Sequence, residues 1–151
     1  MKRLLVAPLF LLLNHQTALA KNESNLIDLI CIAERTGTED RITINIKEKT
    51  AKERYFSELS RVWETTGNYK EGEVKKSPDG TITTDFVKIG EQEIKFGSSM
   101  RGWLNKYNND SIYTLNRYTG RLHKWSITFR EGKLFRESES ERTCTKIERK
   151  F

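Results

Sequence analysis

The chain has 151 residues, a length typical of one domain with a single core. It contains 27 Lys and Arg against 21 Asp and Glu, which gives a formal net charge of +6. The two signs are interspersed without a block of about five or six like charges, so neither a nucleic-acid-binding arm nor a polybasic membrane patch is expected.

Residues 1–20 have the order of a secretory signal peptide. Lys2 and Arg3 precede the apolar run Leu4–Leu13, and small residues up to Ala20 follow as a cleavage site. The run has about half of the roughly 20 residues that a membrane-spanning helix needs. We therefore expect export and no membrane span.

The two cysteines fit an exported chain. We expect one secreted domain over residues 21–151, in the periplasm or outside the cell, where Cys31 and Cys144 meet oxidising conditions. We expect them to form a disulfide, and closing a loop of roughly a hundred residues is worth at most about 4 to 5 kcal/mol in the chain-entropy model. Two buried free thiols are the alternative.

The first elements in chain order are two strands. Residues 26–35 are apolar on both sides, which is typical of a strand covered on both faces and places Cys31 in the interior. In residues 41–49, Ile42, Ile44 and Ile46 fall on one face and polar side chains on the other, as in a half-buried strand.

The segment 50–66 departs from this alternation. Thr50 and Glu53 have capping-box spacing, and an apolar stripe recurs at helical spacing before Gly67. The stripe consists of Phe56, Leu59 and Trp63. We expect one short helix that covers the sheet, with a strand through residues 54–59 as the alternative.

Turn residues divide the rest of the chain into short alternating runs. We expect turns or loops at residues 77–80, 97–102, 108–110 and 131–132, and a last strand at 142–148. About seven to nine strands in succession predict a mainly β fold, an antiparallel meander that forms a small closed or nearly closed barrel. A two-sheet sandwich is the alternative.

The stretch 112–129 is interpreted as a hairpin with its corner at Thr119-Gly120. Gly120 can take the left-handed conformation that completes a short hairpin loop. Arg117 and Arg121 flank the corner. They form either a cationic tip for an acidic partner or, in the interpretation we favour, solvated charges on a structural hairpin.

This hairpin carries a resemblance. The pattern of Leu115, Arg117, Thr119, Gly120 and Leu122, followed by a late cysteine and Lys150-Phe151, resembles a group of uncharacterised small exported proteins of marine cyanobacteria. The similar portion is the last third of the chain, together with a signal peptide and an early cysteine. The resemblance implies a small secreted β fold and no catalytic residue.

Catalytic chemistry is not indicated. His123 is the one histidine after the leader, and both cysteines are expected in the disulfide, so we expect neither a histidine-based site nor a thiolate nucleophile. Acidic residues that could pair are interpreted as solvated edges. They are Asp85, Glu91, Glu93, Glu137, Glu139 and Glu141. We expect no enzymatic activity, no metal and no cofactor.

Aromatic residues, most of them close to bases, are the candidates for a binding surface. They are Trp63, Trp103, Tyr118 and Trp125. Such surfaces stack sugars or bases, but the small charge excess argues against nucleic acid. We expect a non-enzymatic exported β-domain that binds a small ligand, a glycan or an envelope partner. The alternatives are a structural or interaction protein of the cell envelope without a small ligand, and an inhibitor of a secreted hydrolase.

Overall fold

The computed structural model describes residues 25–102 and 106–147. The predicted signal peptide at residues 1–20 and the candidate residue Trp103 lie outside the described residues. Within the described ranges the chain forms strands and turns, with no helix of membrane-spanning length and hydropathy.

Ten strands form one antiparallel sheet, slightly more than the sequence predicts. They are β1 (Leu26–Ala33), β2 (Glu39–Asn45), β3 (Thr50–Ser57), β4 (Val62–Lys70), β5 (Val74–Lys76), β6 (Ile82–Ile89), β7 (Glu93–Arg101), β8 (Tyr107–Asn116), β9 (Arg121–Arg130) and β10 (Lys133–Lys146). The order across the sheet is β4-β3-β2-β1-β10-β9-β8-β7-β6-β5. Consecutive strands are therefore neighbours in the sheet, with the exception of β4 and β5, which lie at its two ends. In addition, the first strand, β1, pairs with the last, β10.

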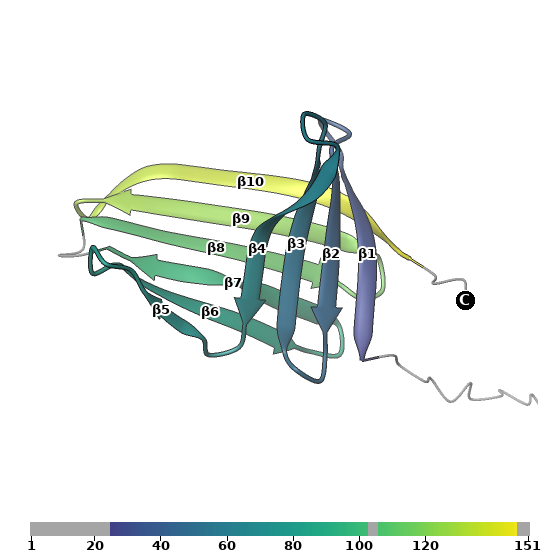
Figure 1. The fold of residues 1–151 in the computed structure, drawn as a ribbon, viewed down its shortest axis with the longest axis horizontal. Helices are drawn as coiled ribbons and strands as arrows, with labels where there is room; N and C mark the ends of the chain where they lie inside the picture. The colour runs from purple at the N-terminus through teal and green to yellow at the C-terminus, as the bar shows by residue number, and fades with distance from the viewer. Residues whose placement is uncertain (1–24, 103–105, 148–151) are drawn as a thin grey trace, which may run out of the picture.

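The sheet curls into a half-barrel, which confirms the predicted nearly closed antiparallel meander. Figure 1 shows β1–β4 crossing in front of β6–β9 at a steep angle, so that two parts of one sheet face each other. The 14-residue β10 belongs to both parts, because it pairs first with β9 and then, near its end, with β1.

The hydrophobic core lies between these two parts. It is made by the inward-facing residues of the alternating strands, among them Ile42 and Ile44 of β2, which are fully buried. Phe96 and Tyr113 stack with ring centroids 4.8 Å apart, and Tyr69 packs against both rings. The full set of buried apolar residues is Leu29, Cys31, Ile42, Ile44, Ala51, Tyr69, Val87, Ile94, Phe96, Tyr113, Leu115, Leu122 and Cys144.

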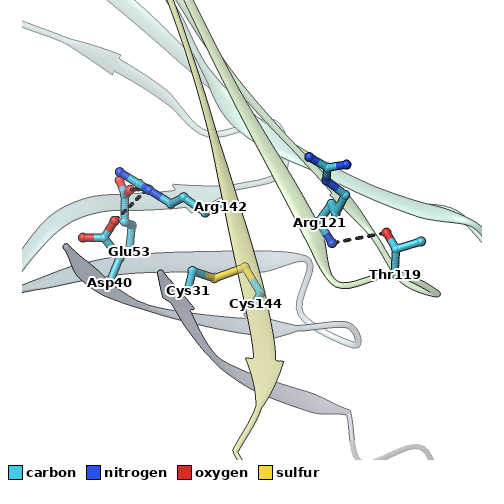
Figure 2. The surroundings of a disulfide bond; sticks show 7 residues. All are labelled: Cys31, Asp40, Glu53, Thr119, Arg121, Arg142 and Cys144. Atoms are coloured by element: carbon cyan, nitrogen blue, oxygen red, sulfur yellow. Dashed lines mark hydrogen bonds and ion pairs between the residues drawn. A yellow bond between two sulfur atoms is a disulfide. The ribbon is translucent and has the colours of Figure 1, made fainter. Parts of the chain in front are cut away.

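The predicted disulfide between Cys31 and Cys144 is present and buried in this core. The two cysteines are direct cross-strand partners on β1 and β10 (Figure 2). The bridge therefore reinforces the pairing of the first strand with the last, where the half-barrel is joined.

The interruption between β4 and β5 is closed by side chains instead of a continuous ladder. Lys75 of β5 donates a hydrogen bond to the Asn68 carbonyl of β4 at 3.3 Å and forms an ion pair with Asp85 of β6 at 2.6 Å. The carboxylate of Glu71 accepts a hydrogen bond of 2.6 Å from the Val87 amide of β6. We call these contacts the β4/β6 seam.

The short helix predicted at residues 50–66 is wrong, because this segment forms β3, a hairpin turn and β4. Glu53, which has the spacing of a capping-box residue in the sequence, instead points into the core and accepts a hydrogen bond from Tyr113. Phe56 and Trp63 meet as a cross-strand pair with ring centroids 5.6 Å apart, while Leu59 is fully exposed at the turn. The backbone pairing of β3 with β2 therefore outweighs the helical spacing of the apolar residues in this segment.

The loop predicted at residues 97–102 and the turn predicted at 108–110 are also wrong, since β7 continues through most of the first segment and β8 through the second. Their inward face is polar there: Ser98, Ser111 and Ser126 lie opposite one another on β7, β8 and β9. Backbone pairing extends these strands past the point where apolar alternation ends.

Candidate functional site

A pocket of about 430 Å³ lies on the outer face of β1–β3, away from the core. It is lined by Asp28, Leu29, Arg41, Thr43, Lys52, Arg54 and Ile147. Its volume is within the range of pockets that hold small ligands. Three positive charges and one negative charge among these residues make its formal charge positive.

Strand alternation places the polar lining residues. On β2, Asp40 and Ile42 point into the half-barrel, so Arg41 and Thr43 point outward. On β3, Ala51 and Glu53 are buried, so Lys52 and Arg54 take the outer face. The apolar and buried residues of these two strands thus fix the direction of the basic ones.

The four outward side chains form a two-by-two block on the sheet. Arg41 is the direct cross-strand partner of Arg54, and Thr43 is the direct partner of Lys52. Such partners have Cβ atoms about 5 Å apart, and successive outward residues on one strand are about 7 Å apart. Arg54 Nη2 donates a hydrogen bond of 3.4 Å to the Thr43 hydroxyl, which links two corners of this block.

Arg41 and Arg54 have hydrogen-bond donors that no described residue of the protein satisfies. The Nε atoms of Arg41 and Arg54 are buried and have no hydrogen-bond partner. The Arg41 guanidinium lies 4.4 Å from the centre of the Trp63 ring, a cation–π contact that leaves its edge donors unused. Like charges directly opposite each other on neighbouring strands are destabilising, so the pair has an unfavourable interaction within the protein alone.

No carboxylate of the described part of the chain lies within ion-pair distance of Arg41, Lys52 or Arg54. Other strand arginines do have such partners: Arg101 is paired with Asp110 at 2.7 Å, and Arg121 with Glu141 at 2.5 Å. Among the described residues that line it, the pocket therefore holds three positive charges against the one carboxylate of Asp28.

A second polar cluster lies inside the half-barrel and has a different character. Arg142 Nη1 lies 2.7 Å from Asp40 Oδ2 and 3.2 Å from Glu53 Oε1, as Figure 2 shows. Tyr113 donates to the other oxygen of Glu53 at 2.6 Å, and Lys124 Nζ lies 3.7 Å from Glu53 Oε1. Two carboxylates and two cations balance, so this cluster links β2, β3, β8, β9 and β10 as a structural network.

Burial alters the titration of this interior cluster. Burial raises the pKa of Asp40 above its ordinary value, and the positive charge of Arg142 opposes that effect. Burial also raises the pKa of Tyr69 to about 12, and it raises the pKa of Tyr113, with the neighbouring Glu53 carboxylate adding to the rise. The two tyrosines remain protonated donors at neutral pH.

The aromatic residues predicted to bind do not share one site. Trp63 lies on the outer face of β4 beside Arg41. Trp125 lies on β9, five strands away across the sheet, and donates to Glu137 at 2.9 Å. Tyr118 is exposed in the turn between β8 and β9. Of the three that are described, Trp63 alone contacts a residue that lines the pocket.

The hairpin corner is held by contacts within the protein. Arg117 donates to the Gly90 carbonyl at 2.9 Å, and Arg121 forms ion pairs with Glu34 and Glu141. Figure 2 shows the backbone amide of Arg121 donating to the Thr119 hydroxyl beside the disulfide. These contacts agree with a structural hairpin.

Three of the acidic residues that the sequence offers as possible catalytic pairs lie beside basic side chains. Asp85 is buried against Lys75, Glu93 is paired with Lys95 at 2.8 Å, and Glu139 lies 3.9 Å from His123. Within the described ranges no group of three or more His, Cys, Asp or Glu could hold a metal ion.

Sequence reasoning missed the basic pocket. The alternation in residues 41–49 indicates that Arg41 and Thr43 face outward, but the assignment of residues 50–66 to a helix hid the matching alternation of Lys52 and Arg54.

No family model matches the chain, and the comparisons found neither a curated protein nor a solved structure similar to it.

Proposed function

We propose that this chain is a non-enzymatic exported β-domain that binds an anionic ligand in the outer pocket of β1–β3. The observation that carries the proposal is the directly opposed pair Arg41 and Arg54, with Lys52 beside them and no carboxylate partner among the described residues. An anion seated between the two guanidinium groups removes their mutual repulsion and accepts charge-assisted hydrogen bonds from both.

Export is supported by the disulfide. A bridge between Cys31 and Cys144, buried in the core, is compatible with an oxidising compartment and with the predicted leader. An acidic glycan or a small acidic metabolite of the periplasm or the extracellular space is the expected class of ligand, because the pocket is open and polar along Thr43 and Lys52.

Ligand titration calorimetry on the purified mature domain tests the proposal. The probes are two acidic sugars, galacturonate and glucose 6-phosphate, with glucose as the neutral control. We expect heat of binding and a rise in melting temperature with at least one acidic sugar and none with glucose, since binding to the native state stabilises it.

Substitution of one arginine locates the binding. Arg54→Gln should weaken binding by tenfold or more, because a charge-assisted hydrogen bond is worth roughly 1.5 to 3 kcal/mol. Arg130→Gln is the matched control, since Arg130 is an exposed arginine of β9 outside the pocket. Equal binding of glucose, or unchanged binding by Arg54→Gln, would contradict the proposal.

A further inference from the structure

We infer that the ligand group held by this pocket is a phosphate monoester, the tetrahedral oxyanion with three terminal oxygens. This inference rests on the proposed function and names the chemistry of its ligand. It follows from how the three cations are placed relative to one another and from their charge.

The first argument is the number of donors. Arg41, Lys52 and Arg54 occupy three corners of the two-by-two block, and Thr43 occupies the fourth. With corners about 5 to 7 Å apart, a group above the centre of the block is within reach of all four side chains. A carboxylate presents two oxygens and would leave one cation without an acceptor, whereas a phosphate monoester presents three terminal oxygens, one for each cation.

The second argument is charge. The lining carries three positive charges and the one negative charge of Asp28. A phosphate monoester carries about −1.5 to −2 at neutral pH, which matches this balance, while a carboxylate or a sulfate ester supplies one negative charge. A phosphodiester likewise carries a single negative charge and has only two terminal oxygens.

The third argument is size and lining. At about 430 Å³ the pocket is larger than a single oxyanion needs, so it has room for the organic body of a small ester. Ile147, which donates its amide to the Asp28 carbonyl at 2.9 Å, is the apolar lining residue at the side of β1, opposite Lys52 and Arg54 of β3. The phosphate is therefore placed over the β2–β3 block, and the rest of the molecule lies toward β1.

Calorimetry with matched probes tests this chemistry. At pH 7.5 glucose 6-phosphate should bind at least tenfold more tightly than glucose 6-sulfate or galacturonate. Inorganic phosphate and vesicles containing phosphatidic acid, whose headgroup is also a phosphate monoester, distinguish a free, a sugar-borne and a lipid source of the same group. Vesicle binding would assign the group to a lipid surface, and tighter binding of inorganic phosphate would assign it to the free ion.

The pH dependence of binding provides an independent readout. The second proton of a phosphate monoester dissociates near pH 6, so glucose 6-phosphate should bind severalfold more weakly at pH 5 than at pH 7.5. Glucose 6-sulfate does not change charge in this range and controls for titration of the protein. The charged groups that line the pocket are Asp28 of β1, Arg41 of β2, and Lys52 and Arg54 of β3, and no histidine is among them.

Three substitutions assign the donors. Arg41→Gln, Lys52→Gln and Arg54→Gln should each weaken glucose 6-phosphate binding by about tenfold, while Lys88→Gln on the exposed part of β6 should not. Equal affinity for galacturonate and glucose 6-phosphate, or affinity that does not change with pH, would overturn the inference and leave the proposed anion binding intact. Failure of every anionic probe would overturn both.

Discussion

Gly120 meets two separate requirements at the corner of the β8–β9 hairpin. Its φ of +70° lies in the left-handed region that side chains disfavour. The Cys144 amide donates a hydrogen bond of 2.8 Å to the Gly120 carbonyl, which brings the two backbones close together. A Cβ on residue 120 would therefore lie 2.4 Å from the Cys144 carbonyl oxygen. The hairpin therefore depends on glycine to approach the disulfide-bearing strand.

Gly120→Ala should lower the free energy of unfolding by about 2 to 4 kcal/mol, the sum of the left-handed backbone term and the displacement of β10. Gly37→Ala is the matched control, because Gly37 has a φ of +68° but nothing within 4 Å of its added Cβ. It should lose only about 1 kcal/mol in urea titrations. Equal losses for the two variants would show that the close approach to β10 has no energetic weight.

Asp40 should give the protein an unusual response to acid. Because burial raises its pKa in the folded state, the folded protein holds this proton more tightly than the unfolded chain. Its contribution to stability is therefore complete below its unfolded-state pKa and is lost as the pH rises through the raised folded value.

The difference in unfolding free energy between wild type and Asp40→Asn should therefore fall as the pH rises from about 3 to 6, measured by urea titration at each pH. Glu39→Gln, the exposed neighbour on the same strand, is the control for general charge effects. A difference that grows with pH would mean that the attraction of Arg142 outweighs burial at this carboxyl group.

At the level of elements, the β4/β6 seam is the place where the barrel lacks a ladder. Asp85 is 2% exposed and forms an ion pair with Lys75, which also donates a hydrogen bond to the Asn68 carbonyl of β4. Lys75→Met should leave this buried carboxylate without its cation and lower stability by about 2 kcal/mol. Denaturant titration measures the loss, and hydrogen exchange should show faster exchange of β4 and β6 amides.

Lys95→Met controls for the loss of an ordinary surface pair. Lys95 and Glu93 are both nearly half exposed and lie 2.8 Å apart on β7, so removing this ion pair should change stability by less than about 0.5 kcal/mol. If the two variants are equally stable, the seam is held by backbone and apolar contacts alone.

The strands predicted from the sequence are those whose inward face is apolar, such as β2 with Ile42 and Ile44, although this strand ends at Asn45 and Ile46 lies in the turn that follows. The predictions for residues 50–66, 97–102 and 108–110 are wrong for one physical reason. Their inward positions hold polar residues, such as Glu53, which accepts a hydrogen bond from Tyr113 of β8, and Ser98, which lies opposite Ser111 of β8. Alternation of hydrophobicity therefore fails as a signal where the interior of the barrel is polar.

The basic pocket depends on register, which no single strand encodes. Arg41 and Arg54 are separated by 13 positions in the sequence and become neighbours only because the β2–β3 hairpin turns between Asn45 and Thr50. The disulfide was predictable because each of two cysteines has one possible partner. The three cations of the pocket come from 27 Lys and Arg residues, so the sequence does not restrict which of them become neighbours.

In the molecule as a whole, β10 connects the two facing parts of the sheet. Near its end, Arg142 pairs with the carboxylates of β2 and β3, and Cys144 is bonded to β1. Arg142 and Cys144 are consecutive inward residues of β10. The polar network of Arg142 and the disulfide of Cys144 therefore both connect β10 to β1–β3, and β10 is in turn paired with β9. The pocket lies on the opposite face of β1–β3, so its geometry depends on this attachment.

Reduction of the disulfide should therefore lower the free energy of unfolding of the whole domain, while the native state keeps its β-sheet. The bridge joins residues 113 positions apart, and the chain-entropy model limits its contribution to about 4 to 5 kcal/mol. Urea unfolding with and without dithiothreitol should show a loss of up to this size, with the far-ultraviolet circular dichroism of the native state retained. The double variant Cys31→Ala/Cys144→Ala should be insensitive to the reductant. A wild-type protein equally stable in both conditions would show that pairing of β1 with β10 and the Arg142 network hold the half-barrel together without the covalent bond.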